Sequence, residues 1–78
     1  MSVYFNRFVL ASQNKDATVR LLVQHQQQLL FDGIMPIQTA KDLYLALRKV
    51  LENYEGEHGS VMPNMEILKQ LGVAPEDV

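Results

Sequence analysis

The 78-residue chain contains no cysteine and has little net charge. Without thiols it forms neither a disulfide framework nor a thiolate zinc site, and it has no cysteine nucleophile. The sequence has seven Lys and Arg residues and nine Asp and Glu residues, so the excess of basic residues that is typical of duplex-DNA binders is missing. No apolar run approaches the roughly 18 residues of a membrane span, and the first ten residues lack the regions of a signal peptide. These absences predict a small cytoplasmic domain with no membrane partner.

The short chain limits the size of the hydrophobic core. Hydrophobic residues make up 47% of the sequence, which is typical of globular proteins and predicts one domain over residues 1–78. A domain of this size buries only roughly 60% of its unfolded surface, and its core supplies about 3–5 kcal/mol. Because disulfides are excluded, we expect association with another chain, most simply as a homodimer, to add to that stability.

The clearest periodic segment is a helix over residues 40–55, inside a main helical region of 39–56. Thr39 is a suitable N-cap, Asp42 gives an approximate capping box, and Gly56 stands where a left-handed C-terminal residue belongs. Apolar side chains recur at helical spacing and form one stripe. Its members are Ala40, Leu43, Leu47, Val50 and Tyr54, with Tyr44 and Leu51 beside them.

The first 37 residues form a region rich in strand signals. Segments 3–10 and 17–24 are predicted strands joined by a turn at 12–16, because Asn and Asp favour turns. The apolar run 29–35 is a possible third strand, with a bulge or bend at Gly33. The expected fold is therefore α+β, with an N-terminal antiparallel meander of two or three strands packed against the long helix.

Residues 17–31 also fit other structures. Val19, Leu22 and Leu29 fall on a helical stripe, so a helix starting after Asp16 is an alternative, as is a strand followed only by loop. The C-terminal part is less ambiguous. Asn64 is expected to cap a short helix over 65–71, within 64–72, and Gly72 to end it, followed by a frayed tail at 73–78.

Part of the sequence resembles a small bacterial domain family of unknown function. That family has a Met-Ser-Pro-x-x-Ala-Lys helix start and a Tyr-Glu helix end followed by Gly. The similar residues here are Ile34-Met35-Pro36, Ala40-Lys41, Leu43, Ala46-Leu47, Leu51, Tyr54-Glu55, Gly59, and upstream Val3-Tyr4, Asn6 and Phe8. The chain departs from the pattern because Pro36 follows Met35 with no Ser between them. The resemblance covers about residues 3–59 and implies strands before one long helix, but no activity and no site residues.

Residues suited to catalysis or metal binding form no recognised pattern. His25 and His58 lie 33 residues apart, whereas zinc ligands usually come in close pairs. No serine lies in a G-x-S-x-G motif, and the four glycines form no phosphate-binding loop. We therefore predict no catalytic, cofactor or metal residues and a non-enzymatic function. An enzyme completed only in an oligomer, where either histidine meets carboxylates of another chain, is a further alternative.

Other features favour protein contact. Strand 3–10 is apolar on both faces, whereas one helix covers only one face. Leu45 lies opposite the helical stripe, flanked by Tyr44 and Arg48, which are residue types enriched in interfaces. We therefore expect a small bacterial or phage protein that acts as a homodimeric adaptor or regulator. Its candidate interface residues are Tyr4, Phe8, Leu10, Tyr44, Leu45 and Arg48.

A nucleic-acid-binding function is the main alternative to the interaction module. It would use Arg7, Arg20 and the aromatic side chains of the first strand, because single-strand binders place aromatics beside basic groups. The small number of cations counts against it, since phosphate contacts scale with positive charge. The segment 24–28, which is Gln-His-Gln-Gln-Gln, is interpreted as a solvated turn.

Overall fold

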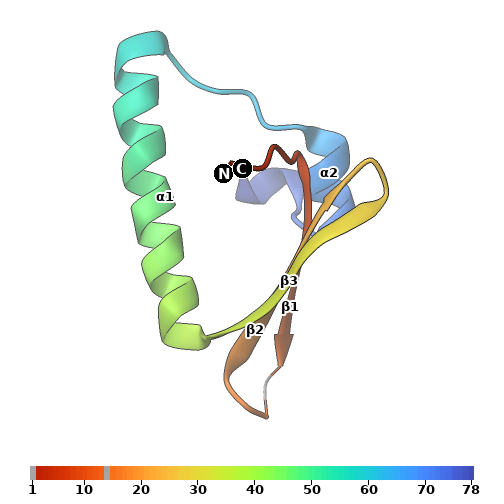
Figure 1. The fold of residues 1–78 in the computed structure, drawn as a ribbon. Helices are drawn as coiled ribbons and strands as arrows, with labels where there is room; N and C mark the ends of the chain where they lie inside the picture. Colours follow the sequence, from red (N-terminus) through yellow and green to blue (C-terminus); the bar gives the residue numbers. More distant parts are fainter. Residues whose placement is uncertain (1, 14) are drawn as a thin grey trace. The chain divides into compact units, whose positions relative to one another are not determined.

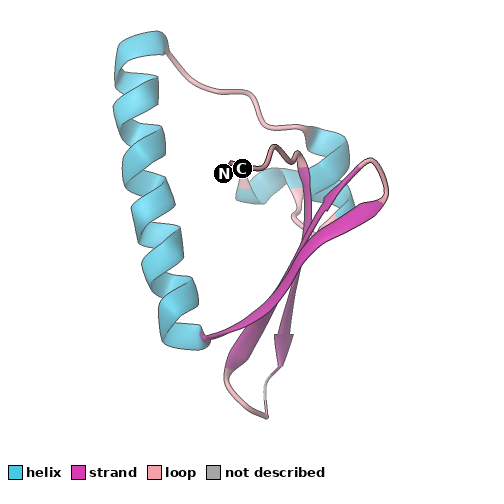
Figure 2. Ribbon diagram, in the orientation of Figure 1, coloured by secondary structure: helices cyan, strands magenta, loops and turns pink. Residues whose placement is uncertain are grey.

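The computed structural model describes residues 2–13 and 15–78. Three strands precede two helices, which confirms the α+β class (Figures 1 and 2). The chain divides into a sheet unit, Met1–Ile37, and a helical unit, Gln38–Val78. The predicted packing of the long helix on the sheet stays a prediction. Neither helix in the described residues is long and apolar enough to cross a membrane.

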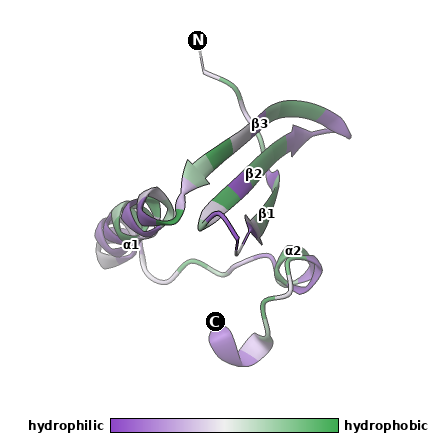
Figure 3. Ribbon diagram, turned by 90° about the horizontal axis from the view of Figure 1, so that it is seen from below, coloured by the Kyte–Doolittle hydropathy of each residue, from purple (hydrophilic) through white to green (hydrophobic). Residues whose placement is uncertain are grey.

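The sheet unit is a three-stranded antiparallel meander in the order β1-β2-β3. Its strands are β1 (Arg7–Gln13), β2 (Thr18–His25) and β3 (Gln28–Pro36), and apolar residues recur along all three (Figure 3). The first turn is closed by the Asp16 N–H, which donates to the Gln13 carbonyl at 3.2 Å. Gln26 and Gln27 alone connect β2 to β3. The third strand is thus confirmed, and the helical alternative for 17–31 is wrong, because this segment pairs on both sides with strands.

One face of the sheet carries its hydrophobic centre. Phe8, Val23 and Phe31 are direct neighbours across the three strands, and Leu10 and Leu21 form the next row. Val23 in the central strand is 7% exposed, and among the residues that the structure describes it is the one hydrophobic residue that is buried.

Gly33 lies beneath the ring of Phe31. A Cβ atom at Gly33 would be 2.5 Å from Cζ of Phe31, so the absent side chain leaves room for the aromatic ring. The predicted bulge at Gly33 is wrong, because Gly33 pairs regularly with Leu21. The irregularity lies beside Val23 and Gln24 and leaves Leu30 as the extra residue.

The first strand begins four residues later than the predicted 3–10 segment. β1 runs from Arg7 to Gln13, so Tyr4 and Phe5 precede it. Sequence propensity favours Val, Tyr and Phe, but pairing decides the register: Ser12 and Gln13 are opposite Val19 and Thr18 and extend the ladder into the predicted turn.

The helix α1 (Ile37–His58) is longer at both ends than predicted. It begins directly after Pro36, so Thr39 is not its N-cap. The Ile37 N–H donates instead to the Ala17 carbonyl at 2.8 Å. Gly56 lies inside the helix, and the left-handed terminal residue is Gly59, with φ of 86°. The first suitable glycine therefore did not end the helix, because glycine in a helix costs only about 1 kcal/mol.

The helix α2 (Met65–Gln70) confirms the predicted capping. The side chain of Asn64 accepts hydrogen bonds from the N–H groups of Glu66 at 3.1 Å and Ile67 at 3.3 Å. Gly72 has φ of 80°, as expected of a left-handed residue after a helix. The tail departs from the prediction of fraying, since it contains the 3-10 turn η1 (Pro75–Asp77).

Candidate functional site

The six predicted interface residues fall into two groups, one in each unit. Phe8 and Leu10 lie on the hydrophobic face of β1, and Tyr4 precedes that strand with 73% of its surface exposed. The side chains of Tyr44, Leu45 and Arg48 belong to α1. Each unit therefore carries one candidate surface.

The helix α1 has a continuous apolar stripe and no buried residue. The large members of this α1 stripe are all exposed: Leu43, Tyr44, Leu47, Val50, Leu51 and Tyr54. Leu45 points to the opposite side, because it is two residues, or about 200°, from Leu47. A single helix is marginal in water unless its apolar face is packed. The stripe is therefore the surface of the helical unit with most to gain from burial.

Charged side chains lie in one row beside the α1 stripe. Lys41 comes from the first half of the helix, Arg48 lies just past its middle, and Glu52 and Glu55 follow in its second half. Their spacings of seven, four and three residues keep them on one flank. The first helical turn has no acidic residue, while acids gather toward the C-terminal half. This order opposes the helix dipole, which favours acids at the N-terminus and bases at the C-terminus.

Some of these charges already have partners within the helical unit. Arg48 Nε donates to Glu52 Oε1 at 3.0 Å. The Val61 N–H donates to Glu55 Oε2 at 2.8 Å, and the Lys41 ammonium lies 5.2 Å from the centre of the Tyr44 ring. The contacts of Arg48 and Lys41 are local and exposed, so a partner surface can engage the same groups.

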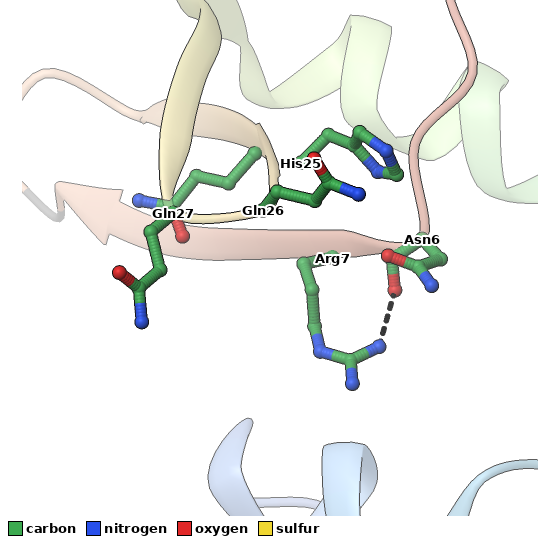
Figure 4. A pocket seen from close by; sticks show the side chains of 6 residues that line it. Asn6, Arg7, His25, Gln26 and Gln27 are labelled. Carbon is green, nitrogen blue, oxygen red and sulfur yellow. Dashed lines mark hydrogen bonds between the residues drawn. The ribbon is translucent and has the colours of Figure 1, made fainter.

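A second candidate site is a hollow of about 480 Å³ at the end of the sheet where β2 turns into β3 (Figure 4). We call it the turn hollow, and it is lined by Asn6, Arg7, Gln24, His25, Gln26 and Gln27. The glutamine-rich segment interpreted as a solvated turn thus forms one wall. The missed feature was the β1–β2 register, which places Gln24 opposite Arg7 and so brings this segment beside β1.

Arg7 is the cation of the turn hollow. Its Nη1 donates to the carbonyl of Asn6 at 3.1 Å, and within residues 2–13 and 15–78 it forms no ion pair. Arg20 differs, because Asp32 neutralises it. Of the two arginines of the predicted nucleic-acid surface, Arg7 is therefore the one without an ion pair in the described residues. Phe8 lies on the opposite face of the sheet from Arg7 and Arg20.

The two histidines each contact a tyrosine. The rings of His25 and Tyr4 meet edge to face with centroids 5.5 Å apart. The His25 Nδ1 atom is shielded from solvent and has no hydrogen-bond partner in the described part of the chain. The His58 ring lies 4.5 Å from that of Tyr54. The described residues contain no group of three potential metal ligands, so neither histidine joins a metal cluster there.

The turn beside the hollow has unfavourable backbone geometry. Gln26 and Gln27 have φ angles of 53° and 68°, as in a type I′ hairpin turn, for which Asn-Gly is the preferred pair. A non-glycine residue in this left-handed region costs roughly 1 kcal/mol. The chain therefore keeps two long polar side chains at positions where its backbone favours other residues.

Replacing Gln26 by Asn together with Gln27 by Gly is expected to stabilise the sheet unit. Removing the left-handed strain predicts a gain of about 1–2 kcal/mol in the free energy of unfolding. Urea denaturation followed by circular dichroism measures this gain. The matched control is Gln24→Asn, which makes a similar change in a strand and has no such strain to relieve. Equal or lower stability of the double variant would contradict the assigned turn.

The second face of the sheet carries an ion pair between neighbouring strands. Arg20 Nε and Nη2 donate to the two carboxylate oxygens of Asp32 at 2.9 and 2.6 Å. Hydrogen bonding to Arg20, reinforced by its positive charge, holds the pKa of Asp32 below its usual range, although desolvation opposes this shift. The same hydrogen bond and the negative charge of Asp32 raise the pKa of Arg20. The pair joins β2 to β3.

The ion pair predicts a loss of stability in acid. Because the folded-state pKa of Asp32 is lowered, its contribution is present above the unfolded-state value of about 3.9 and is lost as the pH falls through the lower folded-state value. The free energy of unfolding of the native chain should therefore fall more between pH 5 and pH 2 than that of Asp32→Asn. Urea denaturation across this range measures both slopes, and parallel slopes would contradict the prediction.

Comparison with known proteins identifies no relative. No family model matches the chain, and neither curated proteins nor solved structures show significant similarity. The resemblance to a bacterial family of unknown function stays a prediction.

Proposed function

We propose that the protein is a non-enzymatic interaction module, a homodimeric adaptor or regulator, in which two copies of α1 pair in antiparallel orientation. The observation that carries this proposal is the exposed α1 stripe with its flanking row of basic and then acidic residues. A second copy supplies both an apolar stripe of the same length and a charge row of the opposite order. A second copy of α1 therefore complements both the apolar stripe and the charge row of the helix.

Antiparallel pairing matches the charge order. A two-fold axis near Leu47 places the first half of one helix beside the second half of its partner, and the same flanks face each other. Lys41 of one copy then approaches the row position of Glu52 and Glu55 in the other. The acidic end of the row, which the helix dipole disfavours, therefore lies beside Lys41 of the partner helix.

The helix is long enough for a stable contact. Its 22 residues extend about 33 Å at 1.5 Å per residue. The six large residues of the α1 stripe are distributed over three turns of it, from Leu43 to Tyr54. Aromatic side chains such as Tyr44 and Tyr54 are among those that dominate interface energetics. The dimer thus obtains the apolar burial that this short chain has in short supply.

Sedimentation equilibrium tests the proposal. The full chain at about 10–100 μM is expected to sediment with twice the mass of one 8.9 kDa chain. Because flanking charges contribute, raising the salt to about 1 M should weaken the association without abolishing it. A single-chain mass across the whole concentration range would overturn the homodimer. A titration with labelled single-stranded oligonucleotide at low salt separates it from nucleic-acid binding.

A further inference from the structure

We propose that the turn hollow is a binding site for a carboxylate group, with Arg7 as its charged anchor. All six lining residues belong to the sheet unit, so the site is separate from the helix pairing proposed above. It adds a ligand-recognition function to the interaction module. Three features of the hollow support it: its charge, its neutral hydrogen-bond donors and its size.

The charge of the lining favours a single negative group. Arg7 is the guanidinium in the wall, and neither Asp nor Glu is among the lining residues. It uses one Nη1 hydrogen bond for the Asn6 carbonyl, whereas a guanidinium carries five N–H donors. Its planar fork matches the two oxygens of a carboxylate. One cation balances a carboxylate, while a phosphate dianion would keep excess negative charge.

Neutral hydrogen-bond donors line the hollow together with this cation. The side chains of Asn6, Gln24, Gln26 and Gln27 each carry an amide NH₂ group, and these groups donate hydrogen bonds without changing the charge. Figure 4 shows the Arg7 guanidinium and the His25 imidazole on opposite sides of β1. We therefore assign the carboxylate contact to Arg7, to Gln24, which is its direct neighbour in β2, and to Gln27. His25 and the Gln26 amide beside it lie on the other side of β1.

The hollow is larger than a carboxylate alone. Its volume of about 480 Å³ lies within the roughly 300–1,000 Å³ of ligand sites. A short aliphatic acid fits, and so does an Asp or Glu side chain presented by a second copy. The C-terminal third supplies such groups, because Glu57, Glu66, Glu76 and Asp77 outnumber Lys69. Both sources offer the same chemistry.

NMR titration of the full chain with sodium propionate tests the proposal. The side-chain signals of Arg7 Nε–H and of the Gln24 and Gln27 amides should shift and saturate, while sodium chloride at equal ionic strength should leave them unsaturated. Arg7→Gln should weaken propionate binding at least tenfold. The control Lys49→Gln removes a cation of α1 that lies outside the charge row and should bind as the native chain does. Arg7→Gln must also retain the native pattern of backbone signals.

Further measurements distinguish a free acid from a carboxylate of a second copy as the ligand. If a second copy supplies the carboxylate, the same signals move on dilution without propionate, and Glu76→Gln with Asp77→Asn removes that response. If they stay constant on dilution, saturation by propionate assigns the site to a free acid. Saturation that survives Arg7→Gln, or tighter binding of inorganic phosphate than of propionate, would overturn the site. Binding retained by the variant Leu47→Asp would show that it does not depend on the helix pairing.

Discussion

Replacing Val23 by Asp is expected to unfold the sheet unit. Val23 is 7% exposed and lies in the central strand between Phe8 and Phe31. The substitution removes apolar burial worth about 1.5–3 kcal/mol and places a carboxylate there at a cost of several kcal/mol. A core of this size supplies only about 3–5 kcal/mol. The variant should therefore lose the dispersed NMR signals of β1, β2 and β3 at neutral pH.

Val9→Asp is the matched control for this substitution. Val9 is 42% exposed, lies in the edge strand and belongs to the opposite face of the sheet. The same chemical change should cost about 1 kcal/mol there, mostly through reduced strand propensity. Urea denaturation compares the two variants directly. A native midpoint for Val23→Asp, or equal losses for both, would show that Val23 is not the centre of the core.

The order of elements could be read from the sequence because it depends on local signals. Alternation in 17–24, the apolar run before Pro36 and the Asn64 and Gly72 pair each act within a few residues. The limits of β1 could not be read in this way. They depend on the register of pairing with β2, whose partner residues lie five to seventeen positions further along the chain, and this register carries Ser12 and Gln13 into the sheet.

The candidate sites show the same division between local and distant information. The α1 stripe follows from helical spacing, so its residues were predicted, but as the face that packs on the sheet and not as an interface. Of the interface residues predicted on this helix, Tyr44 belongs to the stripe, whereas Leu45 lies opposite it. The turn hollow needs Arg7 beside residues 24–27, and only the β1–β2 register creates that proximity. A glutamine pair in a two-residue turn was the one local sign of it. Composition alone favours a solvated turn for such a segment.

Replacing Leu47 by Asp is expected to dissociate the proposed dimer. Leu47 is 53% exposed at the middle of the α1 stripe, close to the two-fold axis of antiparallel pairing. One substitution then places two carboxylates near each other in the centre of the contact. Like charges brought together in an interface cost several kcal/mol, and each 1.4 kcal/mol is a tenfold change in affinity. The dissociation constant should rise by more than about 100-fold.

Leu45→Asp is the control that separates the stripe from the rest of the helix. Leu45 is 46% exposed on the same helix, so both variants lose similar helix propensity, but it lies on the side opposite the stripe. Sedimentation equilibrium and circular dichroism of the two variants should show equal helix content and a monomer only for Leu47→Asp. Dissociation caused by Leu45→Asp alone would move the interface to the surface formed by Leu45 and Arg48. A dimer that survives both substitutions would exclude α1 as the contact.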